Sequence, residues 1–119
     1  MPTLQSLRKQ LDFQRVMESG ESWSDRKFVL VASSQTPSST ETRFGFSVSK
    51  RIGNAVIRNQ MKRRLRSIVC RLDYVGGWDA VLIARKGSIG CNYKEIEISV
   101  SRLLIKSGIA ANRLESKKI

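Results

Sequence analysis

The sequence contains no histidine, only two cysteines, and ten acidic residues against 22 basic ones. Histidine is the commonest general base and metal ligand in proteins, so its absence argues against a protein-borne catalytic or metal centre. Cys70 and Cys91 are too few for a disulfide framework, and their apolar neighbours lead us to expect buried free thiols. The acids form no close pair except Glu95 and Glu97, which a spacing of two places on different sides of a helix. An active site within the polypeptide is therefore unexpected.

The sequence also lacks an apolar run long enough to span a bilayer, a secretory signal, a nucleophile elbow, a phosphate loop and any zinc-ligand spacing. Its 119 residues, 40% of them hydrophobic, are enough for one domain with one core. We therefore expect a single domain over residues 1–119, with residues from 110 to 119 forming a frayed basic tail. We expect the protein in the cytoplasm, without membrane contact.

Positive charge dominates the chain, with a net charge of +12 and a pI of about 10.6. No acid lies between Glu41 and Asp73, yet nine basic residues do: Arg43, Lys50, Arg51, Arg58, Lys62, Arg63, Arg64, Arg66 and Arg71. Apolar residues are interspersed throughout this segment, so it must fold with one side in a core. Fixed positive charge on the other side indicates a polyanionic partner, most simply a nucleic acid. Basicity alone does not separate RNA from DNA or from an acidic membrane surface.

Hydrophobic periodicity predicts three helices and at least three strands. The helices are expected at residues 6–19, 55 to about 72, and from 93 to a stop at Gly108, and the strands at 27–32, 43–49 and 79–85. A further strand is expected near 22–27, and residues 33–42 form a polar turn or loop. Asn54 is a plausible N-cap, and Asn92 with Glu95 resembles a capping box. The fold class is thus α+β, a two-layer α/β sandwich of order α-β-β-β-α-β-α.

The segment after Asn54 divides into two faces when its residues advance by about 100° each around a helix. The apolar face is predicted to hold Ile57, Met61, Leu65, Ile68 and Leu72, and the polar face Arg58, Asn59, Lys62, Arg63 and Arg66. Arginine can grip phosphate at two points, and six phosphate contacts would give a log–log salt slope of roughly −4 to −5. Such a face can also serve solubility alone, but that use typically alternates charge sign, whereas every charge here is positive.

Two further segments are candidates for binding. In the turn from Lys50 to Asn54, Gly53 allows a sharp bend, and the amides of a helix start favour anions. An ordinary strand-to-helix turn with surface charges is the alternative. In the first helix, Phe13 and Met17 lie one turn apart, a spacing that suits a core face or an aromatic surface for single-stranded bases.

The stretch FGFSVSKRIGNAVIRNQMKRRLR, Phe44 to Arg66, resembles the bacterial ribonuclease P protein subunit. Within it, RNQMKRRLR at Arg58 to Arg66 looks like the arginine-rich signature of that family's crossover helix. Further similarity lies in DFQRVMESG, RKFVLVA and IARKG, so that the resemblance runs nearly from end to end.

The resemblance implies an α/β sandwich with a left-handed β-α-β crossover, a fold shared with a domain of a small-subunit ribosomal protein. The chain would be the protein component of an endoribonuclease that removes the 5′ leader of precursor tRNA. Its partners would be the catalytic RNA and precursor tRNA, with no other protein required. Catalysis would belong to the RNA and to Mg²⁺ held mainly by that RNA, with no protein ligand.

The resemblance also implies two sets of site residues. The first binds RNA through Lys50, Arg51, Asn54, Arg58, Asn59, Lys62, Arg63 and Arg66. The second lines a cleft for the single-stranded leader, between the first helix and the sheet, with Phe13, Met17, Val31, Phe46 and Ser47. Met17 and Val31 stand where many family members have aromatic residues, which weakens the expected base stacking there.

Three other functions compete with this one, and the residues argue against the third. A ribosomal or other RNA-binding scaffold protein would have the same basic helix without a leader cleft. A DNA-binding protein would place that helix in a major groove. A nuclease acting without RNA would need catalytic groups that the absent histidine and unpaired acids do not provide.

Overall fold

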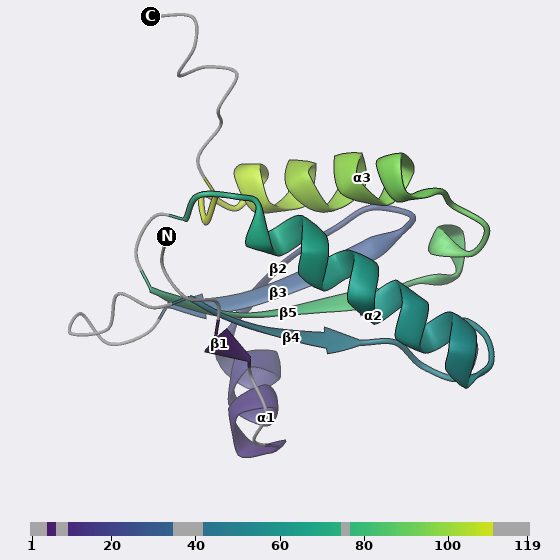
Figure 1. Cartoon of the computed structure of the whole chain (residues 1–119). Coiled ribbons are helices and arrows are strands. Elements are labelled where there is room, and N and C mark those ends of the chain that lie inside the picture. Colours follow the sequence, from purple (N-terminus) through teal and green to yellow (C-terminus); the bar gives the residue numbers. More distant parts are fainter. Residues whose placement is uncertain (1–4, 7–9, 35–41, 75–76, 111–119) are drawn as a thin grey trace, which may run out of the picture.

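Five strands form one mixed sheet in the order β1-β4-β5-β3-β2. The computed structural model describes residues 5–6, 10–34, 42–74 and 77–110. The strands are β1 (Gln5–Ser6), β2 (Glu21–Ser24), β3 (Phe28–Ser34), β4 (Arg43–Ser47) and β5 (Trp78–Ala84). The helices are α1 (Gln10–Ser19), α2 (Ala55–Cys70) and α3 (Tyr93–Lys106), with a short 3-10 turn, η1 (Lys86–Ser88). Helices α2 and α3 cover one face of the sheet, and α1 lies on the other (Figure 1).

The predicted fold class is confirmed, including the strand expected near residues 22–27, which is β2. Strands β2, β3 and β5 pair antiparallel, whereas β4 runs parallel to β5. The β4-α2-β5 connection is left-handed, against the strong general preference for right-handed crossovers (Figure 1). Of the loop predicted at 33–42, Ser33 and Ser34 instead belong to β3, and residues 35–41 lie outside the described part of the chain. Of the tail predicted at 110–119, Ala110 is buried and bridges to Tyr74, and residues 111–119 lie outside the described part.

The start of the first helix differs from the prediction. Gln5–Ser6 is a strand, β1, paired parallel to Arg43–Phe44 of β4, so Ser6 is not helical as predicted. Helix α1 is described from Gln10, and residues 7–9 lie outside the described part of the chain. The spacing of apolar residues at the N-terminus is compatible with a helix. The free edge of β4 offers backbone donors and acceptors, however, and pairing with them decides the local structure.

Both predicted helix caps are confirmed. The Asn54 side chain accepts a hydrogen bond from the Ile57 amide at 3.0 Å. Asn92 and Glu95 form a complete capping box, in which each side chain accepts from the other's backbone N–H, at 2.8 Å and 3.0 Å. These caps satisfy helix-start amides that would otherwise lack partners, so α2 and α3 begin at defined residues.

The main core lies between the sheet and the helices α2 and α3. The alternation predicted for β4 places Phe44 in this core opposite Ala80 of β5, and Leu30 of β3 and Leu82 of β5 belong to the same core. From α2 come Met61, Leu65, Ile68 and Val69, and from α3 Ile96, Val100, Leu103 and Leu104. Among the described residues, none of the helices has the length and apolar character that a bilayer span requires.

The first turn of α2 is more exposed than the periodicity predicts. Ile57, assigned to the apolar face, is 45% exposed, and its neighbour Val56 is 76% exposed. The N-terminal end of α2 projects beyond the end of β4, so no sheet lies beneath it (Figure 1). The expectation of buried thiols is likewise wrong for Cys70, which is exposed on α2, whereas Cys91 is half-buried.

A smaller core holds α1 on the opposite face of the sheet. Val16 of α1 packs on Val31 and Val81, and all three are buried. The helix ends at Gly20, whose amide donates to the Val16 carbonyl at 2.8 Å. A Cβ atom at Gly20 would lie 2.5 Å from that carbonyl oxygen and 2.8 Å from the Ala32 carbonyl oxygen, so only glycine fits this turn.

The turn between β2 and β3 is organised by Asp25. One carboxylate oxygen accepts from the amides of Lys27 and Phe28, both at 2.8 Å, and the other accepts from the Ser99 hydroxyl of α3. Burial of the carboxyl raises its pKa, but these hydrogen bonds and the Lys27 charge outweigh burial, so the pKa of Asp25 lies below its usual value. The charged form of Asp25 therefore stabilises the contact between the hairpin and α3.

We predict that Asp25→Asn lowers the free energy of unfolding at pH 7 by about 1 kcal/mol, because hydrogen bonds to a charged acceptor are lost. A lowered folded-state pKa contributes stability above the unfolded pKa, near 3.8, that disappears as the pH falls through the folded pKa. Urea unfolding at pH 7 and at pH 3 should show that the difference in unfolding free energy between the wild type and Asp25→Asn is smaller at pH 3. Glu21→Gln, at an exposed strand position, is the control. An equal difference at both pH values would contradict the role of the charge.

Candidate nucleic-acid interface

The outward face of α2 carries exposed cations without acidic partners. Lys62, Arg63 and Arg66 are exposed, and so is Asn59, one turn before Lys62 and Arg63. Within the described part of the chain, none of these cations pairs with a carboxylate. We call Arg58, Asn59, Lys62, Arg63 and Arg66 the α2 ridge. The structure thus brings the predicted polar face of the helix together on one surface.

Arg58 differs from the other members of the α2 ridge because it is only partly exposed. Its Nε atom is buried and has no hydrogen-bond partner in the described structure. A buried donor without an acceptor is costly, and such groups are rare. An oxygen of a bound phosphate or ribose would satisfy Nε while the guanidinium keeps its charge at the surface.

In the turn before α2, two of the three predicted RNA-binding residues have exposed side chains that are available to a ligand. Lys50 and Arg51 are exposed, next to the start of the helix. Asn54 is exposed too, but its side-chain oxygen already accepts from Ile57, which leaves only its NH₂ group available. The turn therefore adds two cations to the same end of α2 as Arg58.

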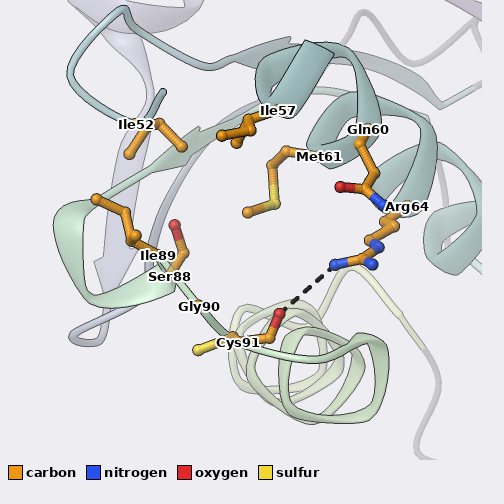
Figure 2. A pocket seen from close by; sticks show the side chains of 9 residues that line it. All are labelled: Ile52, Ile57, Gln60, Met61, Arg64, Ser88, Ile89, Gly90 and Cys91. Carbon is orange, nitrogen blue, oxygen red and sulfur yellow. Dashed lines mark hydrogen bonds between the residues drawn. The ribbon is translucent and has the colours of Figure 1, made fainter. Parts of the chain in front are cut away.

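The opposite flank of α2 is attached to α3 and to the loop before it. Arg64 donates to the Cys91 carbonyl at 3.5 Å (Figure 2), Ser67 shares a hydrogen bond with Tyr93 at 2.9 Å, and Arg71 lies 3.7 Å from Glu97. These contacts separate Arg64 and Arg71 from the α2 ridge. They explain why only part of the positive charge in this helix faces outward.

The predicted leader cleft is only partly assembled. Phe13 lies against β4, because a Cβ atom at Gly45 would be 2.3 Å from its ring. Met17 is exposed, and Ser47 is exposed on the same face of the sheet as Gly45. Val31 is on this face as well, but it is only 5% exposed beneath α1 and offers little surface to a ligand.

Phe46 does not belong to this cleft. Its ring stacks with that of Phe44, with centroids 6.4 Å apart and an interplanar angle of 6°, and it packs against the main core. Successive residues of a strand point to opposite faces, so Phe46 and Ser47 cannot line the same cleft. Sequence reasoning instead missed Val29 and Ile83, half-buried beside α1. The alternation within β3 and β5 was the signal that could have identified them.

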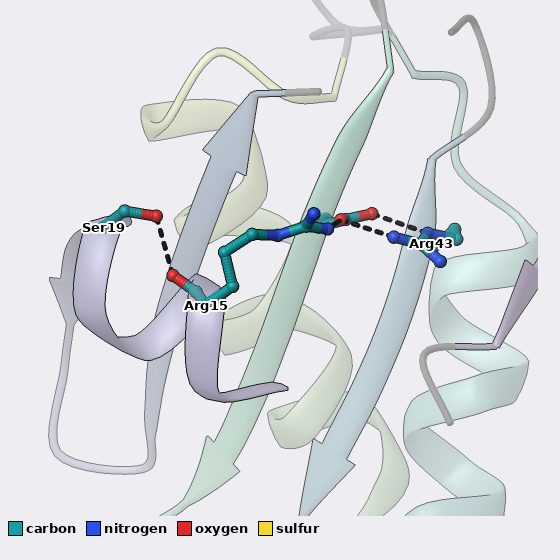
Figure 3. A network of polar contacts seen from close by, with 4 residues as sticks. Arg15, Ser19 and Arg43 are labelled. Atoms are coloured by element: carbon teal, nitrogen blue, oxygen red, sulfur yellow. Dashed lines mark hydrogen bonds and ion pairs between the residues drawn. The ribbon is translucent and has the colours of Figure 1, made fainter. Parts of the chain in front are cut away.

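A buried carboxylate, Asp79, lies at one end of the α1 face. It accepts from Arg43 at 2.8 Å and 2.7 Å and from Arg15 at 2.8 Å. The side chains of Arg15 and Arg43 reach toward each other across the sheet (Figure 3). Arg43 stands opposite Asp79 in the β4–β5 register, and Arg15 reaches across from α1. Asp79 thus connects α1 to both parallel strands, and its charge is compensated by two guanidinium groups.

The described residues offer no evident catalytic or metal-binding constellation. No group of three or more cysteine, aspartate and glutamate side chains in this part of the chain could hold a metal ion. The buried carboxylate of Asp79 is engaged by arginines rather than free to act as a base. What the arrangement can do is bind: a cationic ridge on one face of the sheet and a partly apolar surface on the other.

We predict that Asp79→Ala lowers the free energy of unfolding by about 2 kcal/mol, because Arg15 and Arg43 lose a charged hydrogen-bond acceptor. Arg15→Ala should cost less than about 1 kcal/mol, since the exposed Arg15 is screened by solvent and Arg43 still pairs with Asp79. Urea unfolding of both variants against the wild type measures the contrast. Similar small losses in both variants would show that Asp79 does not organise this face.

Comparison with known proteins places these features in a family. The Ribonuclease P family model matches residues 1–108. The ribonuclease P protein component of Bacillus velezensis is 39% identical over 104 residues, covering 87% of this chain and 89% of the relative. That of Microcystis aeruginosa is 32% identical over 114 residues, covering 92% and 95%.

Solved structures agree with the sequence comparison. The Staphylococcus aureus RNase P protein superposes with a TM-score of 0.80 at 30% identity, covering 89% of this chain and 97% of that one. The Thermotoga maritima RNase P protein gives a TM-score of 0.77 at 26% identity, covering 86% and 96%. The family match over nearly the whole chain, together with these relatives, establishes that the chain belongs to the bacterial ribonuclease P protein family.

Proposed function

We propose that this protein binds the catalytic RNA of ribonuclease P through the α2 ridge and the Lys50–Arg51 turn, and contacts the 5′ leader of precursor tRNA on its α1 face. The holoenzyme then removes the leader by Mg²⁺-dependent cleavage. The observation that carries the proposal is the exposed positive charge of Lys62, Arg63 and Arg66, which pair with no carboxylate among the described residues, in a member of this family. Relatives named ribonuclease P protein component support the assignment to tRNA 5′ processing.

The proposed mechanism is electrostatic. The catalytic RNA and the precursor tRNA are both polyanions, and each must approach the other closely for cleavage. A folded helix already holds these cations on one surface, where they can neutralise phosphates. Their binding to phosphates also releases condensed counterions from the RNA. The protein therefore lowers the Mg²⁺ concentration that the RNA needs, while the ion itself is bound mainly by RNA.

Leader binding is the second part of the proposal. Phe13 and Met17 offer an aromatic edge and a polarizable sulfur beside the half-buried Ile83, a surface suited to unstacked bases. Ser47 can add a hydrogen bond to the leader backbone. Val31 is buried beneath α1, and Phe46 packs on the opposite face of the sheet. We therefore expect weaker contact with the leader than in relatives that have more aromatic residues on the α1 face.

The chemistry of cleavage is assigned to the RNA. The chain has no histidine, and Asp79 is held between two arginines. A general base needs a proton acceptor within reach of the attacking water, and the described surface of α2 presents cations and amides instead. The protein's contribution is to bind and to orient two RNA molecules.

We expect this protein, added to a bacterial ribonuclease P RNA at low Mg²⁺, to cleave a 5′-extended precursor tRNA that neither component cleaves alone under those conditions. The assay is the release of the 5′ leader, measured over a series of Mg²⁺ concentrations. An unchanged Mg²⁺ requirement would contradict the electrostatic mechanism. Equal affinity of the holoenzyme for leader-bearing and mature tRNA would favour an RNA scaffold function instead.

We further predict that Lys62→Ala, Arg63→Ala and Arg66→Ala each weaken binding to the catalytic RNA and reduce the slope of log affinity against log salt by about 1, since each removes a phosphate contact. Arg102→Ala, an exposed cation of α3, is the matched control and should leave the slope unchanged. The slope is obtained for each variant by measuring its affinity for the RNA at four or more salt concentrations. Equal effects of all four substitutions would indicate that net charge alone, rather than the α2 ridge, binds the RNA.

A further inference from the structure

A pocket of about 270 Å³ lies between the N-terminal half of α2 and the loop that joins η1 to α3. Ile57, Met61 and Arg64 line it from α2, and Ile89 and Cys91 line it from the loop (Figure 2). Side chains of Ile57 and Met61 point toward the loop across the pocket, and the Arg64 guanidinium stands at one end (Figure 2). The pocket is separate from the α1 face, because α2 lies on the other side of the sheet (Figure 1).

The walls of this pocket combine exposed apolar surface with positive charge. Ile57 is 45% exposed and Ile89 is 52% exposed, although both are large aliphatic residues. None of the nine lining residues is acidic. Arg64 makes one long hydrogen bond, 3.5 Å to the Cys91 carbonyl, and its other guanidinium donors can still reach a ligand. The occupant must therefore be partly apolar and must tolerate or carry negative charge.

The position and the size of the pocket indicate which class of ligand it can hold. Ile52 lines the pocket and directly follows the exposed Lys50 and Arg51, so the rim of the pocket adjoins the turn proposed to bind RNA. Pockets for drug-sized ligands typically measure about 300–1,000 Å³, so this one suits a single ring system rather than a length of folded peptide. A nucleobase has flat apolar faces and polar edges, and its ribose links it to phosphates.

We propose that the pocket receives one unpaired nucleobase of the RNA bound on α2, an inference that rests on the proposed function. The base lies between Ile57 and Ile89 above Met61, where aliphatic and sulfur contacts replace the aromatic stacking common in RNA-binding proteins. Arg64 donates to an acceptor on the edge of the base. Insertion thus adds an apolar contact to a surface that otherwise binds phosphates.

The test exploits two isoleucines of nearly equal exposure. Ile89→Ser removes a wall of the pocket, whereas Ile98→Ser acts on an outward residue of α3 that is 49% exposed and does not line the pocket. We expect Ile89→Ser to bind the ribonuclease P RNA about tenfold more weakly at every salt concentration, through loss of apolar contact. The salt slope should stay at its wild-type value, because no phosphate contact is lost. Ile98→Ser should match the wild type.

A direct readout is chemical probing of unpaired bases in the RNA. We expect one or a few bases to be protected in the wild-type complex and to regain reactivity with Ile89→Ser and with Ile57→Ser. The second variant guards against a folding defect in the first, and equal thermal unfolding temperatures identify a folded variant. Wild-type affinity and protection in both folded pocket variants would overturn the proposal, as would weaker binding without any base-specific change.

The outcomes separate this inference from the proposed function. If the α2-ridge variants change the salt slope while both pocket variants behave as wild type, the pocket inference fails and the proposed function stands. If the wild-type protein neither binds the RNA nor supports cleavage of precursor tRNA, the proposed function fails first. Loss of base protection in the pocket variants alone supports the pocket.

Discussion

The packing of one apolar stripe of α2 against the sheet is the interaction on which the rest of this structure depends. The helix has no acid, so its cations repel one another, and like charges four residues apart, such as Lys62 and Arg66, each cost about 0.2–0.5 kcal/mol. Burying Leu65, Ile68 and Val69 contributes roughly 1.5–3 kcal/mol for each side chain, which outweighs that repulsion. Packing therefore holds in helical form a segment whose charges oppose it, and the same packing directs those charges outward.

The two faces of the sheet are stabilised by different means. On the α2 side, a continuous core joins the sheet to α2 and α3, and polar contacts such as Ser67–Tyr93 fix the helices relative to each other. On the α1 side, a small valine cluster is supplemented by Asp79, which binds arginines from α1 and β4. The Arg15–Asp79 ion pair supplements this small core in holding α1 against the sheet.

In the proposed function, these two supports let the protein contact two RNA partners through separate surfaces. The α2 ridge lies on one face of the sheet and Phe13 on the other, so the catalytic RNA and the leader need not compete for the same residues. Fixed cations give affinity that depends on salt, whereas the apolar surfaces beside α1 and at Ile57 and Ile89 add contacts that do not. The proposed function thus assigns the cleavage reaction to RNA and the organisation of its partners to the protein.

Local patterns in the sequence determined the helix caps at Asn54 and Asn92, the alternation of β4 and the cationic face of α2, because each depends on neighbours a few residues away. The resemblance to a family supplied the left-handed crossover, which general preferences would have rejected. Only the tertiary structure decided that Gln5–Ser6 joins the edge of β4, that α2 projects beyond the sheet and exposes Ile57, and that Phe46 faces away from Phe13. It also decided that Asp79 meets two arginines and that α2 and a distant loop enclose a pocket. These features arise where segments far apart in the chain meet, and periodicity within one segment carries no information about its partner across the sheet.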